Sequence, residues 1–335
     1  MFGWINDALF GLLGWINSWA GGWGISIIVF TVLIRLCLTP LDIRSRASMR
    51  KTTKLQPQLA ALQKKYANDR DKLNAKTAEL YKKANVNPLS SCLPLLLTWP
   101  ILIAVFAAMR SAANKELLQQ VGQILSGQEP VMEQFLWIKN LWMPDNLFST
   151  ALPNKATLQM VSGDEWVTWF NSLQGNIPAL LESLNLTEAS FRGNELATTV
   201  QSIIAAMETV PFYAEGVATI PGYTIPLVNW SVPHLYNGYL LLPILSAVSQ
   251  IAMTKIMSGG QPQQQTVEGQ PNTGKFMQWF FPLFSLWICL GYSAAFALYW
   301  VAGNLVSMGQ TFAINQYLDK KEQMAAPVAG EGSVK

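Results

Sequence analysis

The stretch Gly24-Ile-Ser-Ile-Ile-Val-Phe-Thr-Val-Leu-Ile-Arg-Leu-Cys-Leu-Thr-Pro-Leu41 contains a single charged residue, Arg35. A run this long and apolar predicts a helix that crosses a lipid bilayer. An arginine at membrane depth costs about 3 kcal/mol or more, so such residues are rare and usually functional. The group that satisfies this charge is therefore the first question about function.

The composition is that of a membrane protein. Half of the 335 residues are hydrophobic, only 13% are charged, and there are 13 tryptophans. Besides the first run, four nearly uncharged segments lie near 89–109, 239–257, 276–290 and 294–314. Most approach the roughly 20 residues that span a bilayer. We therefore expect an all-α integral membrane protein with five transmembrane helices.

The first residues predict an amphipathic helix at the membrane surface. Trp4, Trp15 and Trp19 are mixed with the polar residues Asn6 and Asp7, a pattern suited to the lipid–water interface. No basic n-region precedes an apolar core, so a secretory signal peptide is not expected. The expected order is an interfacial helix at 1–22, a span at 23–41, a basic helical hairpin at 42–88, a span at 89–113, an outer insertion at 114–237, a span at 238–257, a linker at 258–275, two spans within 276–317 and a tail at 318–335.

The charges of the loops predict the topology. Residues 42–88 carry twelve basic and four acidic side chains, whereas 114–237 carry four basic and eleven acidic ones. Positively charged loops remain in the cytoplasm. We therefore expect the N-terminus outside, the hairpin and the C-terminus in the cytoplasm, and the segment 114–237 outside.

Apolar residues recur at helical spacing in the basic loop, which predicts two antiparallel helices joined by a short turn. Asn68 or Asp69 is the expected N-cap of the second helix. The hairpin is either a solvated charged element or a docking surface. In the outer insertion, helices are expected near 178–186 and 195–209. The insertion contains four tryptophans, Trp137, Trp142, Trp166 and Trp169. These residues predict that the insertion packs on itself or on the membrane surface.

Three of the apolar segments carry polar residues along one helical face. The stripes are Thr31, Arg35 and Thr39; Ser246, Gln250 and Thr254; and Trp300, Asn304, Ser307, Thr311 and Asn315. A single stripe of this kind usually joins helices, at about 0.6 kcal/mol per hydrogen bond. None of the apolar segments holds an acidic residue that could pair with Arg35. Three polar stripes together with such an arginine favour a shared hydrated groove.

Several classes of function lack the residues they need. The apolar segments hold no Asp or Glu, which argues against a proton-coupled transporter, and no phosphate-binding glycine loop with a lysine occurs. The one histidine, His234, has no metal-ligand neighbours, and Cys37, Cys92 and Cys289 fit packing within the spans. We expect no catalytic residue, no metal and no cofactor, and hence no enzyme.

Ordered motifs connect these segments to a known family. They are Phe30-Thr-Val-Leu-Ile-Arg35, Thr39-Pro40-Leu41, Lys54-Leu-Gln-Pro57, Asn87-Pro-Leu89, Cys92-Leu-Pro-Leu95, Trp99-Pro-Ile101, Ala297-Leu-Tyr-Trp300 and Asn304-Leu305. Taken in order, they resemble the core of the YidC/Oxa/Alb family of membrane protein insertases. The match covers roughly two-thirds of the chain.

The resemblance implies a five-helix core with a groove that is open to the cytoplasm and the lipid. In the family, the groove arginine attracts the acidic or polar segment that precedes an incoming span. Arg35 matches this arginine, and Thr31 and Trp300 match positions that contact the client, with Gln250 aligned more loosely. With the polar stripes, the expected groove residues are Thr31, Arg35, Thr39, Gln250, Trp300, Asn304 and Ser307.

The resemblance also implies partners and a location. We expect a bacterial plasma-membrane (inner-membrane) insertase and chaperone of the type that lacks the large periplasmic domain. Its partners would be the lipid bilayer and nascent membrane proteins with short or acidic translocated tails, with a Sec-type translocon and the ribosome as further candidates. No other contact with nucleic acid is expected.

Two other functions remain open from the residues. The same basic groove fits a transporter of a small anion or a lipid, which would show saturable flux without a polypeptide client. It also fits a scaffold subunit whose groove is filled by one fixed partner helix.

Overall fold

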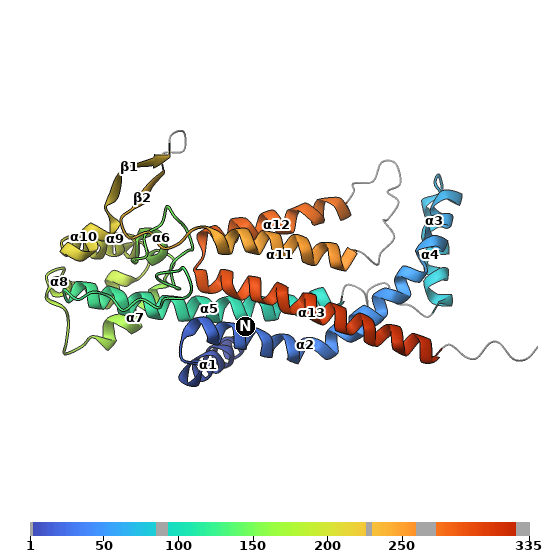
Figure 1. Cartoon of the computed structure of the whole chain (residues 1–335), viewed down its shortest axis with the longest axis horizontal. Coiled ribbons are helices and arrows are strands. Elements are labelled where there is room, and N and C mark those ends of the chain that lie inside the picture. The colour runs from blue at the N-terminus through green and yellow to red at the C-terminus, as the bar shows by residue number, and fades with distance from the viewer. Residues whose placement is uncertain (1–2, 85–92, 226–229, 259–272, 326–335) are drawn as a thin grey trace, which may run out of the picture. The chain divides into compact units, whose positions relative to one another are not determined.

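The computed structural model describes residues 3–84, 93–225, 230–258 and 273–325, and these are mostly helical (Figure 1). The helices are α1 (Gly3–Ala20), α2 (Trp23–Lys54), α3 (Gln56–Lys65), α4 (Arg70–Lys83), α5 (Leu93–Leu125), α6 (Lys155–Leu158), α7 (Gly163–Ser172), α8 (Ala179–Glu182), the 3-10 helix η2 (Glu188–Phe191), α9 (Glu195–Glu208), α10 (Pro211–Val217), α11 (Leu241–Ser258), α12 (Thr273–Gly291) and α13 (Ala294–Ala325). The expected helical class is confirmed.

The sequence did not predict the small antiparallel sheet of β1 (Thr219–Ile225) and β2 (Trp230–Pro233). In its register Thr219 lies opposite Pro233 and Ile225 opposite Trp230, with an irregularity between residues 219 and 224. One proline and one glycine inside β1, Pro221 and Gly222, obscure the alternating pattern by which a strand is recognised.

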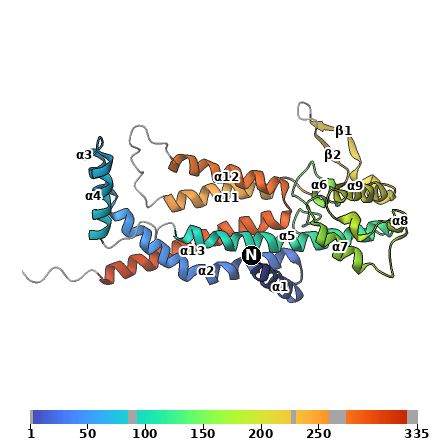
Figure 2. The same cartoon turned by 180° about the vertical axis from the view of Figure 1, so that it is seen from behind.

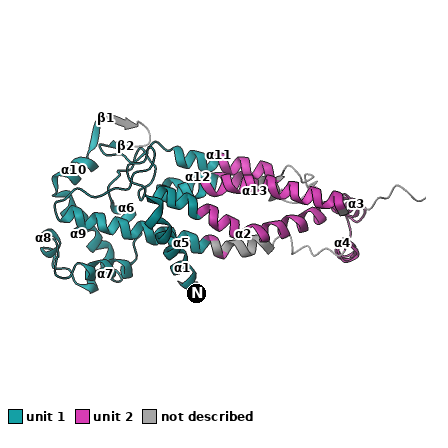
Figure 3. Ribbon diagram, turned by 60° about the horizontal axis from the view of Figure 1, so that its bottom comes forward, with its two compact units in different colours: residues 1–30, 103–247, 283–301 teal, residues 31–102, 248–282, 302–335 magenta. Residues whose placement is uncertain are grey.

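The chain forms two compact units (Figure 3). Unit 1 comprises residues 1–30, 103–247 and 283–301, and unit 2 comprises 31–102, 248–282 and 302–335. The helices α2, α5, α11, α12 and α13 each contribute residues to both units. The segment 114–237, called the outer insertion after its predicted location, falls in unit 1 together with α1, whereas the basic hairpin falls in unit 2.

Each of the five apolar segments is helical over most of its described part, although α11 begins only at Leu241 of 239–257. Among the described residues, α2 alone is long and apolar enough to cross a membrane, judged by length and composition, while α11 and α12 hold shorter apolar runs at Leu241–Met257 and Gln278–Gly291. In α13 the polar stripe lowers the mean hydropathy. The helix α2 contains Pro40 and continues past residue 41, the predicted end of the span, to Lys54.

The outer insertion packs on itself around aromatic side chains. Trp166 is fully buried and stacks on Phe191 at a centroid distance of 5.6 Å, and Trp169 meets Trp166 edge-on at 5.4 Å. Trp142 is also buried, against Trp23 at the start of α2. Such pairs add about 1 kcal/mol beyond the area that they bury. Of the two expected alternatives, packing on itself or on the membrane, the contacts of Trp166 and Trp169 support the first.

The helices expected in the insertion differ in outcome. The segment 195–209 forms α9, as predicted, whereas only Ala179–Glu182 of 178–186 is α-helical. The helix α5 also extends into the insertion as far as Leu125, because Leu117, Val121 and Ile124 on one of its faces are buried in unit 1.

A buried carboxylate joins the insertion to the start of α11. Asp145 accepts hydrogen bonds from Trp137 Nε1 at 3.1 Å and from the backbone N–H groups of Tyr239, Leu240 and Leu242 at 2.8, 3.1 and 2.7 Å. The first N–H groups of a helix have no partner within it, and an acidic cap also complements the helix dipole. Gly238 is required beside it, since a β-carbon there would overlap the carboxylate.

An amide network lies next to this cap. Asn237 is fully buried, and its Nδ2 donates to the carbonyl groups of Asn140, Met143 and Pro144 at 2.9, 3.0 and 2.9 Å. Its Oδ1 accepts from the N–H of Asn140 at 2.8 Å. Every polar atom of the Asn237 side chain is thus hydrogen-bonded, and these bonds hold the end of the insertion against residues 140–144 within unit 1.

Unit 2 contains the predicted basic hairpin, in which α3 and α4 lie side by side (Figure 2). Asp69 is the N-cap of α4, and its carboxylate accepts from the N–H of Lys72 at 3.0 Å. Further along α4, Glu79 bonds to Lys76 at 2.7 Å and lies 2.8 Å from Lys83. The hydrogen bonds from these lysines lower the pKa of Glu79 to about 2.

The cysteines have different environments. Cys289 is buried in unit 1, as expected for a packing residue, whereas the side chain of Cys37 in unit 2 is exposed. A membrane helix can present such a side chain to lipid, so exposure here does not require water. Cys92 lies outside the described residues.

Candidate functional site

Arg35 projects from α2 in unit 2 and is half-buried. Among the residues that the structure describes, its guanidinium forms neither an ion pair nor a hydrogen bond. Asp42, two helical turns later on the same face of α2, acts on this charge through space without reaching ion-pair distance. The sequence placed Asp42 outside the span, but its seven-residue spacing from Arg35 is a signal that could have been read.

Gly303 of α13 provides room for the arginine. Arg35 Nη2 lies 3.4 Å, and Thr31 Cγ2 3.8 Å, from the point where a β-carbon on Gly303 would stand. Thr31 itself is fully buried. A small residue lets two membrane helices approach closely, so Gly303 brings the backbone of α13 up to this part of α2.

Thr39, the third residue of this stripe, joins the two helices. Its Oγ1 donates to the carbonyl of Arg35 at 3.1 Å and accepts from Gln310 Nε2 at 2.8 Å. Gln310 Nε2 also lies 2.9 Å from that same carbonyl. Thr39 is therefore engaged between helices, and Gln310, which was not among the predicted site residues, is its partner.

The predicted residues of α13 and α11 in unit 2 differ in how well they are satisfied. Asn304 is buried, and its Nδ2 donates to Ser249 Oγ at 3.0 Å. Ser307 is also buried, and its Oγ has no hydrogen-bond partner within the described part of the chain. Gln250 is half-buried, and its carbonyl accepts from Thr254 Oγ1 at 2.8 Å.

Trp300 belongs to unit 1, so the structure does not place it against the other six predicted residues. It lies one helical turn before Asn304 on α13, and its ring packs on Phe296 at a centroid distance of 5.7 Å. The indole Nε1 is buried and lacks a partner among the described residues. Ser307 and Trp300 thus each hold a buried polar atom with no described partner.

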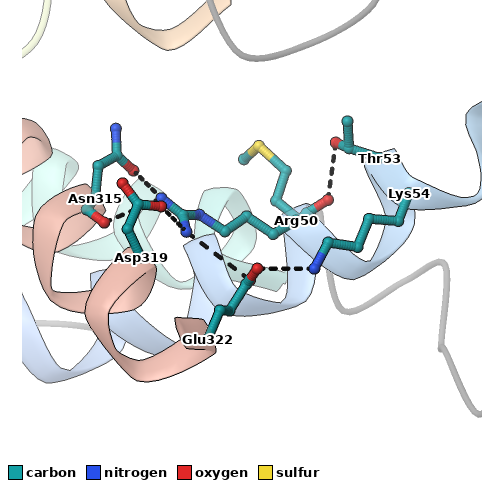
Figure 4. Close-up of polar contacts among 7 residues, drawn as sticks. Arg50, Thr53, Lys54, Asn315, Asp319 and Glu322 are labelled. Atoms are coloured by element: carbon teal, nitrogen blue, oxygen red, sulfur yellow. Dashed lines mark hydrogen bonds and ion pairs between the residues drawn. The ribbon is translucent and has the colours of Figure 1, made fainter. Parts of the chain in front are cut away.

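Beyond the apolar run, basic residues of α2 contact the later part of α13 in unit 2 (Figure 4). Arg46 Nη2 donates to Thr311 Oγ1 at 2.7 Å. Arg50 donates to Asn315 and forms an ion pair with Asp319 at 2.6 Å. The last contact is between Lys54 and Glu322, at 2.8 Å. Residue numbers rise together on both helices, so α2 and α13 run parallel here.

These contacts indicate what the site can do. No group of three or more potential metal ligands of the His, Cys, Asp or Glu type occurs among the described residues. At Arg35, unit 2 instead offers a half-buried positive charge that has no ion-pair partner among the described residues and lies near Thr31 of α2 and Gly303 of α13. Such an arrangement can attract and bind a carboxylate or another anion, because a desolvated guanidinium binds these groups bidentately.

Comparison with known proteins gives one family. The family model described as "60Kd inner membrane protein" matches residues 15–322, which includes α2, most of α13 and all seven predicted site residues. The relatives are curated proteins named membrane protein insertase YidC. That of Chlorobaculum tepidum is 26% identical over 315 residues, which is 94% of this chain and 36% of the relative.

Two further relatives share shorter and more similar regions. The protein of Fusobacterium nucleatum is 40% identical over 145 residues, 43% of this chain and 63% of the relative. The protein of Anaeromyxobacter dehalogenans is 37% identical over 137 residues, 41% of this chain and 22% of the relative. The chain thus spans less than two thirds of each relative's length. Since the family model covers nearly the whole chain, this protein belongs to the 60Kd inner membrane protein family, the YidC/Oxa/Alb family whose motifs it carries.

Proposed function

We propose that this chain is a membrane protein insertase and chaperone. Arg35 attracts the acidic or polar segment that precedes an incoming apolar span. That segment then crosses the membrane while the span moves into lipid. The clients are nascent membrane proteins with short or acidic translocated tails, and a Sec-type translocon and the ribosome are further proposed partners.

The observation that carries the proposal is the state of Arg35. A half-buried guanidinium on a helix apolar enough to span a membrane lacks an ion-pair partner among the described residues. The carboxylate of Asp42, on the same face of α2, acts on it only through space. A client carboxylate that reaches hydrogen-bond distance would therefore interact with Arg35 more strongly than Asp42 does.

The groove and its topology are part of the same proposal. Five spans with the N-terminus outside, the C-terminus in the cytoplasm and a groove lined by the seven predicted residues are supported by helices over the five apolar segments and by the charges of the loops. The buried Ser307 Oγ and Trp300 Nε1 would be satisfied by water or by a client's polar backbone.

The energy for transfer comes from the client and from the membrane potential. Each apolar side chain that leaves water contributes about 2 kcal/mol. An elementary charge that crosses 100 mV contributes about 2.3 kcal/mol, which assists an acidic tail moving outward. Arg35 needs only to lower the barrier for the first polar residues, so no nucleotide hydrolysis is required.

Insertion into proteoliposomes that contain the full chain tests the proposal. Two matched clients, one with an acidic and one with a neutral translocated tail, are scored by protease protection. We expect Arg35→Ala to reduce insertion of the acidic-tailed client about ten-fold, equivalent to about 1.4 kcal/mol in the barrier. Arg35→Lys should retain part of the activity, because a point charge still attracts a carboxylate.

The matched control is Arg44→Ala, which removes an exposed arginine from the same helix. It should leave both clients inserted normally. Normal insertion of the acidic-tailed client by Arg35→Ala would refute charge capture. Saturable uptake of a small anion into the same vesicles, without any client and dependent on Arg35, would instead support a transporter.

A further inference from the structure

A second basic feature of unit 2 lies apart from Arg35. A cavity of about 330 Å³ is lined by the cations Arg46, Arg50 and Lys54 of α2. Its apolar wall is formed by Met49 of α2 and by Ile256 and Met257 at the end of α11. Thr53, Asn315 and Glu322 complete the lining, and the Glu322 carboxylate is paired with Lys54. The cavity therefore combines cations with apolar side chains, which is the combination that an amphiphilic anion requires.

The cations of the cavity are only partly neutralised. Arg50 is paired with Asp319 at 2.6 Å, and Lys54 with Glu322 at 2.8 Å. Arg46 differs from them, because its hydrogen-bond partner is the neutral hydroxyl of Thr311 and no carboxylate lies within ion-pair distance of it among the described residues. Only one of its five N–H groups has a hydrogen-bond partner among the described residues.

Both α2 and α11 reach the cavity at the end of an apolar run. The apolar residues of α2 end at Leu41, and a rise of 1.5 Å per residue puts Arg46 roughly 8 Å further along the helix. This is about the thickness of one headgroup layer outside a hydrocarbon core of about 30 Å. On α11 the apolar run ends at Met257, which itself lines the cavity.

We propose that this cavity binds the headgroup of an anionic phospholipid. The phosphodiester accepts hydrogen bonds from Arg46, with Lys54 as a second cation, and the glycerol and upper acyl chains lie against Met49, Ile256 and Met257. An acidic peptide would use the same cations but would not need the apolar wall. This site is distinct from the proposed client site and does not depend on it.

The test is native mass spectrometry of the full chain in detergent, titrated with dioleoyl phosphatidylglycerol or with dioleoyl phosphatidylcholine. We expect saturable binding that favours phosphatidylglycerol. Arg46→Gln keeps a donor for Thr311 but removes the charge, and it should weaken phosphatidylglycerol binding about ten-fold, or about 1.4 kcal/mol. Arg46→Lys should restore most of the affinity.

Arg44→Gln is the matched control, since it removes one exposed charge from the same helix two residues away. It should change the affinity by less than about two-fold. Lys54→Gln, at a side chain that is 67% exposed and therefore tolerant of substitution, should weaken binding even where Arg46→Gln impairs folding. Equal losses for Arg44→Gln and Arg46→Gln would overturn the proposal, because they would indicate non-specific attraction.

Two further measurements separate the lipid from other anions. Met257→Gln should weaken binding of phosphatidylglycerol about three-fold, as expected from a lost apolar contact, but leave binding of sn-glycerol 3-phosphate unchanged. Glycerol phosphate or inorganic phosphate that displaces the lipid at equal concentration would overturn the lipid assignment. So would displacement by an acidic peptide with no preference between the two lipids.

Discussion

Arg35 Nη2 lies 3.4 Å from the position that a β-carbon on Gly303 would occupy, so the guanidinium rests against the backbone of α13. This relationship makes Gly303 the residue that sets the space for the charge. Alanine forms helices more readily than glycine, but its β-carbon would stand at this close distance from the Arg35 side chain.

Substitutions at Gly303 should therefore depend on size. Gly303→Ala adds one atom at a tight but tolerable distance, and the loss in packing is offset by a gain in helix propensity of about 1 kcal/mol. Gly303→Val should displace Arg35 and lower the free energy of unfolding by about 2 kcal/mol. Thermal unfolding in detergent measures both, and equal midpoints for the alanine and valine variants would contradict the close approach.

Asp145 should be among the most sensitive residues of unit 1. Asp145→Ala leaves the N–H groups of residues 239, 240 and 242 without their acceptor, and we expect a loss of about 3 kcal/mol in the free energy of unfolding. Denaturation of the full chain in mixed micelles measures this loss. The control is Asp164→Asn, because Asp164 is 87% exposed and its pair with Arg192, at 3.3 Å, should contribute less than about 0.5 kcal/mol.

Gly238→Ala should reproduce the loss caused by Asp145→Ala, because its β-carbon would overlap the Asp145 carboxylate. If the overlap is the cause, the double variant should be little worse than either single variant. Additive losses in the same denaturation experiment would show that the two residues act independently.

The pairing of Arg50 should contribute more to stability than that of Lys54. Arg50 is 25% exposed and bonds to both Asn315 and Asp319, whereas Lys54 is 67% exposed and meets Glu322 alone. We expect Arg50→Gln to cost about 1 to 2 kcal/mol and Lys54→Gln less than about 0.5 kcal/mol. Thermal unfolding at low and high salt tests this order, and the Lys54 contribution should vanish at 1 M salt.

The hairpin should respond to acid. The pKa of Glu79 is lowered to about 2 by its hydrogen bonds to Lys76 and Lys83. A carboxylate whose pKa is lowered on folding stabilises the folded helix above its ordinary pKa of 4.5, and this contribution is lost as the pH falls toward 2. NMR titration of ¹³C-labelled glutamate, with Glu79→Gln for assignment, should show a midpoint well below 4.5. The double variant Lys76→Gln/Lys83→Gln should raise that midpoint.

Much of the fold could be predicted because apolar runs and charge patterns are local signals. The helix over 195–209, the cap at Asp69 and the burial of Trp142 and Trp166 all follow from such patterns. The strand pair at 219–233 and the continuation of α2 to Lys54 did not follow. In the first case prolines hide the alternation, and in the second the basic residues after Leu41 are stabilised by contacts with α13.

The site was predictable to a similar degree. The stripe that contains Thr31, Arg35 and Thr39 was visible in one segment. The partners of that stripe, Gly303 and Gln310, were not, since they lie more than 260 residues away and pair only in the folded chain. Spacing within a helix indicates which residues share a face, but it does not indicate which face of another helix they meet.

The polar contacts between α2 and α13 also have a consequence for the synthesis of the chain. Arg50 and Asp319 are 269 residues apart, and a ribosome adds about 5 to 20 residues per second. After Arg50 is made, roughly 13 to 54 s pass before its carboxylate partner exists. Throughout that interval Arg50 lacks Asp319, its ion-pair partner on α13. Until α13 has been synthesised, the basic end of α2 therefore depends on anions other than the carboxylates of α13.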